Sequence, residues 1–195
     1  MEIVNRVKNI LLTPKVEWET IETEQDTHVK ILTSYLLLLA LIPAVGQFIG
    51  EGLIGRTVLG IHIGGTFGWG IRQAIISYIS MVGGVYLTAF VINLLADSFG
   101  SAKNFDKAFA LVAYSYTPMC LAGVFYIFPS LSILAFLAGL YGLYILYTGL
   151  KPIMKTPDEK QTVYFVISLI SVFVVSGIMT AVLGVIFAKS LFTIF

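Results

Sequence analysis

The sequence predicts an all-α integral membrane protein with five transmembrane helices, an N-terminal amphipathic helix and a small glycine-rich external hairpin. Of its 195 residues, 57% are hydrophobic and only 12% are charged, and the mean hydropathy is +0.91. A soluble globule of this length could not bury so much apolar side-chain surface. Four runs without charged residues, one of them of double length, then predict the number of crossings.

Residues 1–30 are predicted to form a cytoplasmic amphipathic segment. At 100° per residue, an apolar stripe covers about a third of the helical circle. The stripe consists of Ile3, Val4, Val7, Ile10 and Leu11. Arg6 and Lys8 flank it, where their stems can snorkel to lipid headgroups. We therefore expect Ile3, Val7 and Leu11 to contact the bilayer surface, and packing of this helix on the protein's own loops is an equal alternative.

The residues that follow this stripe suggest how the chain approaches the membrane. Thr13-Pro14 resembles a helix cap followed by proline at the first helical position, and Trp18 is placed to anchor at the interface. No short apolar region ending in a small-residue cleavage site follows the first thirty residues. A removable secretory signal is therefore not expected.

Residues 31–195 are predicted to form the transmembrane domain. A helix needs about 20 apolar residues to cross the hydrocarbon, and the long run from Ala108 to Leu150 can turn at Phe128-Pro129-Ser130. The expected spans are about 31–50, 73–96, 108–128, 130–150 and 161–188. The runs are continuous rather than alternating, which predicts helices instead of barrel strands.

The distribution of Lys and Arg predicts the orientation. Five crossings put the chain ends on opposite sides, with nine basic residues on the side of the N-terminus and three on the other. The nine are Arg6, Lys8, Lys15, Lys30, Lys103, Lys107, Lys151, Lys155 and Lys160, and the three are Arg56, Arg72 and Lys189. By the positive-inside rule, the N-terminus lies in the cytoplasm and the C-terminus outside. A bacterial inner membrane is the expected location.

The loop 51–72 contains seven glycines and is too short to cross yet too apolar for an ordinary solvated loop. Leu59, Ile61 and Ile63 alternate with other residues, and Gly64-Gly65 can supply a tight turn. These features favour a small external hairpin. A re-entrant segment shielded by other helices is the alternative.

The stretch AYSYTPM, residues 113–119, places hydroxyl groups beside a proline in the third span. Pro118 cannot donate to the carbonyl of Tyr114, so the helix should bend there. The nearby hydroxyls can satisfy that carbonyl or contact a neighbouring helix. Pro43 makes a similar break in the first span, and small residues at four-residue spacing favour close helix packing, chiefly within the chain.

No residue pattern supports catalysis, a cofactor or a metal site. His28 and His62 lie on opposite predicted sides, and Cys120 is the only cysteine. No nucleophile, base and orienting group fall at matching depth, and no glycine-rich loop opens a soluble helix. The net charge of +1 provides no field for nucleic acid.

Three further stretches carry a resemblance: FGSAKNFDKAFALVAYSYTPMCLAG, FPSLSILAFLAGLYGLYILYTGL and KPIMKTPDEKQTVY. Together with VKNILLTPKVEW near the N-terminus, they resemble the Yip family, the Ypt-interacting-protein type of five-span membrane proteins, in its prokaryotic form. The resemblance is strongest over Phe99 to Tyr164. It implies a polytopic membrane protein with a cytoplasmic N-terminus. Eukaryotic members bind Rab-type GTPases, but the Asp-Leu-Tyr-Gly-Pro element ahead of their first span is missing here, which argues against Rab binding.

The leading functional hypothesis is a non-catalytic scaffold that associates with other membrane proteins or with itself, or that organises the lipid bilayer. Its expected helix-contact residues are Tyr114, Tyr116, Pro118, Tyr141 and Tyr144. The alternative is a transporter or channel for small solutes or ions, in which the breaks at Pro43 and Pro118 face each other. Its polar candidates are Asn93 and Asp97.

Overall fold

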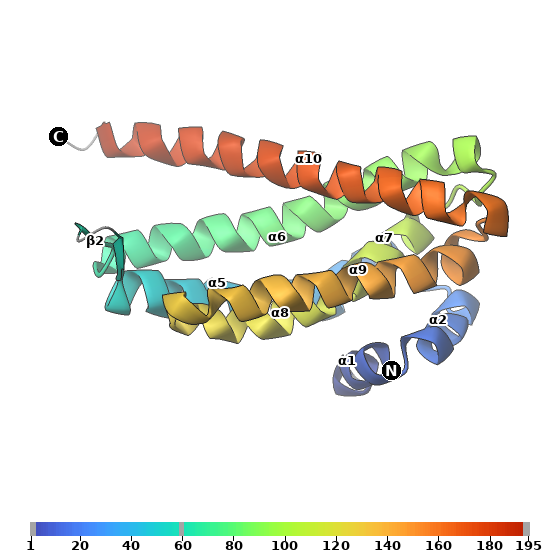
Figure 1. The fold of residues 1–195 in the computed structure, drawn as a ribbon, viewed down its shortest axis with the longest axis horizontal. Helices are drawn as coiled ribbons and strands as arrows, with labels where there is room; N and C mark the ends of the chain where they lie inside the picture. The colour runs from blue at the N-terminus through green and yellow to red at the C-terminus, as the bar shows by residue number, and fades with distance from the viewer. Residues whose placement is uncertain (1–2, 59–60, 193–195) are drawn as a thin grey trace.

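A computed structural model describes residues 3–58 and 61–192 of the chain. Within these residues, five helical segments are long and apolar enough to cross a membrane. They are His28–Ile54, Phe67–Phe99, Phe105–Ile127, Ser132–Met154 and Asp158–Val185. They run side by side along the long axis of the molecule, and the described chain begins and ends at opposite ends of the bundle (Figure 1). The predicted all-α fold with five spans is confirmed.

The first span is the least regular. It consists of α3 (His28–Ile31), a π-helical turn (Leu32–Leu36), α4 (Leu37–Leu39), α5 (Leu41–Gln47) and a second π-helical stretch (Phe48–Ile54). A π-helical turn widens a helix and breaks its regular hydrogen bonding. The first span also extends beyond the predicted range 31–50, by three residues at its start and four at its end.

The remaining spans are more regular. The second is α6 (Phe67–Leu95) with a 3-10 turn (Ala96–Phe99), and the third is α7 (Phe105–Ser115), α8 (Thr117–Ala122) and a 3-10 segment (Gly123–Ile127). A short 3-10 turn (Pro129–Leu131) leads into α9 (Ser132–Met154), and α10 (Asp158–Phe192) follows. The predicted turn between the third and fourth spans is thus where the helices separate.

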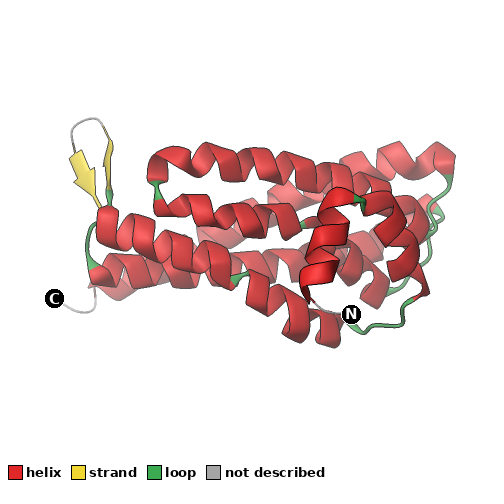
Figure 2. Ribbon diagram, turned by 90° about the horizontal axis from the view of Figure 1, so that it is seen from below, coloured by secondary structure: helices red, strands yellow, loops and turns green. Residues whose placement is uncertain are grey.

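A two-stranded hairpin lies between the first two spans, at the end of the bundle away from the N-terminus (Figure 2). Strand β1 (Arg56–Val58) pairs antiparallel with β2 (Ile61–Ile63), with Thr57 opposite His62. The hairpin is therefore confirmed over a re-entrant segment. The turn is not at Gly64-Gly65: these glycines follow β2 with φ of 89° and 72°, and the residues between the strands, Leu59 and Gly60, lie outside the described residues.

The third span forms the centre of the bundle. In its most apolar stretch 72% of the residues are buried, against 17% in the fifth span. The first and third spans touch backbone to backbone, because a Cβ on Gly123 would lie 2.6 Å from Pro43 and one on Gly46 would lie 2.3 Å from the carbonyl oxygen of Gly123. Glycine is needed wherever helix axes come this close.

The break at Pro118 occurs as predicted. Helix α7 ends at Ser115 and α8 begins at Thr117. The hydroxyl of Thr117 donates to the carbonyl of Tyr114 at 2.6 Å, which is the carbonyl that Pro118 cannot reach. The hydroxyl of Tyr35 lies 2.7 Å from the hydroxyl of Thr117, so the first span forms a hydrogen bond at the break in the third span.

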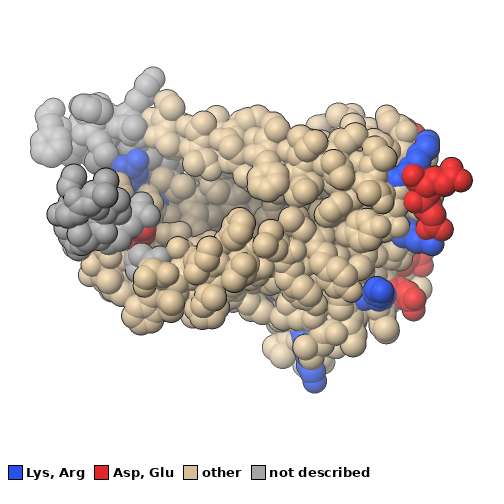
Figure 3. All heavy atoms as spheres, viewed as in Figure 1, with Lys and Arg blue, Asp and Glu red and all other residues tan. Residues whose placement is uncertain are grey.

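Charged side chains gather at the two ends of the molecule, and the face between them is uncharged in the view of Figure 3. The end that carries the N-terminus and the α9–α10 connection is hereafter the charged end, and the opposite one is the hairpin end. A bilayer fits between them, because ionised side chains are costly in hydrocarbon and cheap at its surfaces.

Candidate functional site

The N-terminal segment folds back on the charged end of the bundle. Helix α1 (Ile3–Leu12) and helix α2 (Pro14–Thr23) form an elbow at Thr13, with α2 lying against α9 (Figure 1). Pro14 occupies the first position of α2, as expected from its fixed φ. Thr13 makes no side-chain cap; its hydroxyl donates to the carbonyl of Asn9 at 3.2 Å.

Arg6 locks this elbow. The residue is only 4% exposed, and its guanidinium donates to Glu17 at 2.6 Å and also to Glu24. The guanidinium also lies over the ring of Tyr114, 5.2 Å from the centroid. Burial alone would lower the pKa of Arg6, but the hydrogen bond to Glu24 and the negative charges around it outweigh burial. The pKa of Arg6 is therefore raised, and the group stays charged.

The placement of Arg6 corrects the expectation that it snorkels to headgroups. The spacing contains a weak signal for this outcome: Arg6 lies three residues after Ile3 and four before Ile10, so it borders the stripe on the side of Ile10, which is fully buried. A cation buried at the edge of an apolar stripe needs a partner. Glu17, eleven residues away, is that partner because the elbow returns α2 to α1.

Trp18 attaches α2 to the fourth span. Its indole is fully buried, and the indole N–H donates to the carbonyl of Ile145 at 3.1 Å. Gly149 makes room for it, since a Cβ there would lie 2.6 Å from the indole ring. The expectation that Trp18 anchors at the lipid interface is therefore wrong: the protein interior takes up the ring.

Lys107 and Asp106, at the start of the third span, complete the attachment. The Lys107 ammonium donates to three carbonyl oxygens at the end of α2 and beyond, those of Ile21, Glu22 and Glu24, at 2.6–3.1 Å. Asp106 accepts from the backbone N–H of His28 at 2.7 Å and lies 2.6 Å from its ring. A cation at a helix C-terminus and an anion at a helix N-terminus both match the helix dipole.

Three of the expected helix-contact residues lie inside the bundle. Tyr114 and Pro118 are buried and Tyr116 is half-buried. Tyr114 packs edge-on against Tyr35, with ring centroids 4.8 Å apart, and also contacts Trp18. Tyr114 thus joins the third span to the first span and to the N-terminal segment, and most of the surface of these three residues is covered within the chain.

Tyr141 and Tyr144 lie elsewhere, on the outer face of α9. Their rings stack at 5.7 Å, and both side chains are exposed. The hydroxyl of Tyr141 donates to the carbonyl of Leu11 at 2.6 Å, which ties the end of α1 to the fourth span. The structure thus divides the five residues into an internal group and an outer pair.

All of the apolar stripe of α1 except Val4 faces the protein. Ile3, Val7 and Leu11 are half-buried and pack against the hydrophobic core. The outward side of the elbow instead exposes Val4 and Leu12. The placement matches the alternative of packing on the protein itself, and contact of these three residues with lipid stays a prediction.

The residues of the transport alternative are not gathered at one place. Pro43 packs against Gly123 of the third span. Asn93 is half-buried on α6, and its side-chain amide oxygen has no hydrogen-bond partner among the described residues. Asp97 is exposed at the charged end and pairs with Lys103 at 2.9 Å. Transport stays an untested prediction.

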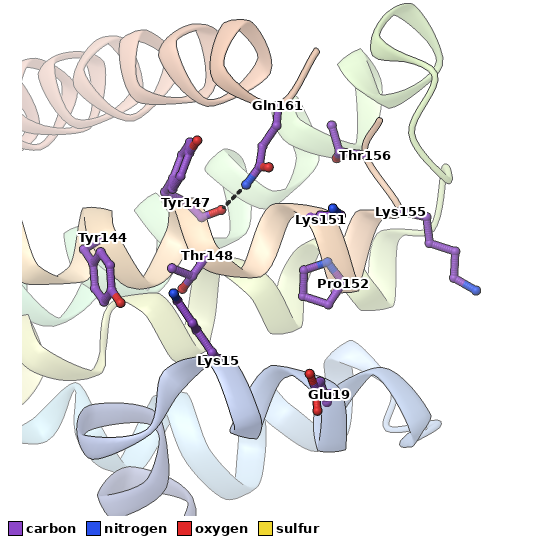
Figure 4. Close-up of a pocket in the computed structure, with 10 residues that line it drawn as sticks. All are labelled: Lys15, Glu19, Tyr144, Tyr147, Thr148, Lys151, Pro152, Lys155, Thr156 and Gln161. Atoms are coloured by element: carbon purple, nitrogen blue, oxygen red, sulfur yellow. Dashed lines mark hydrogen bonds between the residues drawn. The ribbon is translucent and has the colours of Figure 1, made fainter. Parts of the chain in front are cut away.

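Two grooves lie beside these contacts. A groove of about 780 Å³ runs between α2 and α9 at the charged end, and an apolar one of about 520 Å³ lies between α5 and α6. Figure 4 shows the first, with Lys15 and Glu19 reaching from α2 toward the side chains of α9. In the parts of the chain that the structure describes, no three His, Cys, Asp or Glu side chains form a group that could hold a metal ion.

Comparison with known proteins adds the family. The Yip1 domain model matches residues 8–187. The inner membrane protein YohC of Escherichia coli (strain K12) is 26% identical over 133 residues, which cover 65% of this chain and 65% of that protein. The protein of the same name from Escherichia coli O6:H1 (strain CFT073) gives the same values. The chain thus spans slightly under two thirds of these relatives' length, and no solved structure matches it.

Proposed function

Since the chain belongs to the Yip1 domain family of multi-pass membrane proteins, we propose that it is a non-catalytic scaffold that associates with other membrane proteins or with itself. Family members are in general non-catalytic. The proposal includes the location suggested by the relatives' printed name, a bacterial inner membrane. It also includes a cytoplasmic N-terminus, which the nine-to-three distribution of basic residues supports.

The outward face of α10 is the observation that carries this proposal. Gly177 and Ala181 are exposed, Gly184 is half-buried, and a Cβ added to either glycine would meet no atom within 4 Å. Their spacing of four and three residues puts them on one side of the helix, opposite the buried Val175 and Leu183.

Small residues on a span let a second helix approach closely, which is how helices associate where lipid removes the hydrophobic driving force. The sequence favoured packing within the chain for such residues. On α9 this holds for Gly142, where a Cβ would lie 2.6 Å from the carbonyl of Ser115. On α10 the small-residue face has no partner among the described residues, which leaves it for another helix.

The N-terminal segment supports the proposal in a different way. The buried ion pair between Arg6 and Glu17 joins α1 to α2, and the hydrogen bond of Trp18 fixes α2 to α9. The N-terminal segment is therefore held in one arrangement. Preorganised surfaces bind with a smaller loss of conformational entropy. A scaffold benefits from this rigidity, whereas a gated transporter requires movement.

Photo-crosslinking in native membranes tests the proposal. A photoreactive residue replaces Phe173, which is 66% exposed and lies one turn before Gly177 on the same face. We expect a discrete adduct, either a dimer or a complex with another membrane protein identified by mass spectrometry. In the presence of Gly177→Leu, the adduct should fall about tenfold, equivalent to about 1.4 kcal/mol.

Val182→Leu is the matched control, because it adds bulk to an exposed position on a different side of α10. The adduct should persist in this variant. Crosslinking to lipid alone, or equal adduct yields in both variants, would contradict association through this face.

The orientation has its own test. In a Cys120→Ser background, which removes the single cysteine, Lys8→Cys and Phe67→Cys each introduce one exposed thiol at opposite ends. A membrane-impermeant maleimide should label Phe67→Cys in intact cells and Lys8→Cys only after lysis. The reverse pattern would show that the N-terminus lies outside.

A further inference from the structure

The groove between α2 and α9 contains side chains of both charges. Lys15 and Glu19 line it from α2, and Lys151 of α9 and Lys155, which directly follows α9, line the opposite side (Figure 4). Lys151 pairs with Asp158 at 2.6 Å, and Lys155 pairs with Glu22 at 3.3 Å. Lys15 and Glu19 are exposed and have no ion pair among the described residues. The groove therefore offers one available cation and one available anion.

These charges decide between classes of ligand. Since Lys151 and Lys155 each pair with a carboxylate, and Lys15 and Glu19 carry opposite charges, the groove has no net positive charge, so an anionic ligand gains little from it. A ligand that carries a phosphate and an ammonium group complements both free side chains at once. The groove also contains a hydrogen-bond acceptor. Pro152 has no N–H, so it cannot donate to the backbone carbonyl of Thr148, which also lines the groove.

The outer face of α9 indicates that this ligand is a lipid. Ile133, Leu137, Leu140 and Tyr144 are all exposed and lie on one helix face at spacings of four and three residues. Lys151 continues that face two turns further on. The face thus changes from apolar to aromatic to charged along its length, in the order of the acyl chains, interface and headgroup of a phospholipid.

The walls of the groove are held in place from several sides. Trp18, between Lys15 and Glu19 in the chain, is fixed to the fourth span. Tyr144 stacks on Tyr141, and Gln161 of α10 donates to the carbonyl of Tyr147 at 2.9 Å. The side chains of Lys15 and Glu19 therefore extend from a helix whose backbone is fixed against α9.

We infer that this groove binds a zwitterionic phospholipid with a primary ammonium headgroup, with its phosphate at Lys15 and its ammonium at Glu19. A trimethylated headgroup of the same net charge has no N–H to donate to a carboxylate. The site should therefore discriminate phosphatidylethanolamine from phosphatidylcholine. The carboxylate of Glu19 supplies this selectivity. The inference does not depend on the proposed scaffold function.

Native mass spectrometry of the full-length protein tests this assignment. The protein is released from bilayers that contain equal parts of phosphatidylethanolamine, phosphatidylcholine and phosphatidylglycerol. We expect phosphatidylethanolamine to be the main lipid retained. Glu19→Gln should lower its ratio to phosphatidylcholine about threefold, the scale of one exposed charge pair, while Lys15→Gln should reduce retention of all three phospholipids.

Lys8→Gln is the matched control, an exposed cation on α1 that does not line the groove. It should leave the lipid pattern unchanged, and the thermal unfolding midpoint should be the same in all variants because each altered side chain is exposed. Preferential retention of phosphatidylglycerol, or an ethanolamine-to-choline ratio unaffected by Glu19→Gln, would overturn the assignment.

Discussion

The third and fifth spans are both apolar helices, yet the structure uses them in opposite ways. The fifth has the higher hydropathy, and only 17% of its most apolar stretch is buried; the third has the lowest hydropathy of the five spans and is 72% buried. In a soluble protein the order would be reversed, because water drives the most apolar helix inside. In a bilayer the lipid takes up apolar side chains equally well, so hydropathy does not select the interior.

The third span instead lies inside because its small and polar residues find partners there. Ala110 and Ala113 allow neighbouring helices to approach, and Thr117 satisfies the carbonyl freed by Pro118. The ring of Tyr114 contacts Tyr35 of the first span, Arg6 of α1 and Trp18 of α2. Buried polar groups in hydrocarbon are costly unless they are hydrogen-bonded. Specific contacts therefore place this helix at the centre.

Arg6→Ala should have the largest effect, because it removes the cover over Tyr114 and leaves the buried Glu17 without its cation. Breaking a buried ion pair in this way typically costs about 3–5 kcal/mol. We expect the N-terminal segment to detach, detected as rapid proteolysis after Lys8 and Lys15 in detergent micelles.

The matched control is Val4→Ala on the exposed side of the same helix, which keeps both cleavage sites and should stay resistant. Replacing the pair together, as Arg6→Met with Glu17→Met, should recover much of the lost stability, because no fully buried charge is then left unpaired and water can solvate the partly exposed Glu24. Proteolysis of the double variant as fast as that of Arg6→Ala would contradict this reading of the ion pair.

Alanine in place of glycine sharpens the comparison between the two spans. Gly123→Ala puts a Cβ 2.6 Å from the backbone of Pro43, whereas Gly177→Ala meets no atom within 4 Å. Overpacking of this kind costs about 1–3 kcal/mol. The midpoint of unfolding by sodium dodecyl sulfate should fall for Gly123→Ala and stay unchanged or rise for Gly177→Ala.

Removal of one hydroxyl from each of the two spans should give a smaller difference in stability between them. Thr117→Val leaves the carbonyl of Tyr114 without its donor, at a cost of about 1 kcal/mol. Thr180→Val on α10 removes a hydroxyl that bonds only to its own helix, to the carbonyl of Ser176, and is exposed. Its unfolding free energy should be unchanged, and equal losses in the two variants would remove the distinction between the spans.

Tyr141→Phe should have the smallest effect. It removes the hydroxyl that bonds to the carbonyl of Leu11 but keeps the ring stacked on Tyr144. We expect a loss of about 0.5 kcal/mol, because the residue is exposed and water can replace the donor. Hydrogen exchange should quicken at the end of α1 and remain unchanged in α7.

Much of the candidate site was beyond prediction from the sequence. The apolar stripe of α1 was visible, but its partner was not, since lipid and protein surfaces are equally suitable for Ile3, Val7 and Leu11. The elbow at Thr13-Pro14 was visible too. The consequence that Arg6 meets Glu17 depends on the angle between two helices, which no spacing rule supplies.

The sequence by itself determined the five crossings and the break at Pro118. These follow from short-range causes: the thickness of a bilayer and the missing N–H of proline. Only the tertiary structure decided that the loop after the first span is a hairpin, that Thr117 satisfies the freed carbonyl, that Trp18 and Arg6 turn inward, that the third span is central and that α10 keeps an open face. Burial in a membrane protein is a choice between two apolar surroundings, and only the contacts between distant segments distinguish them.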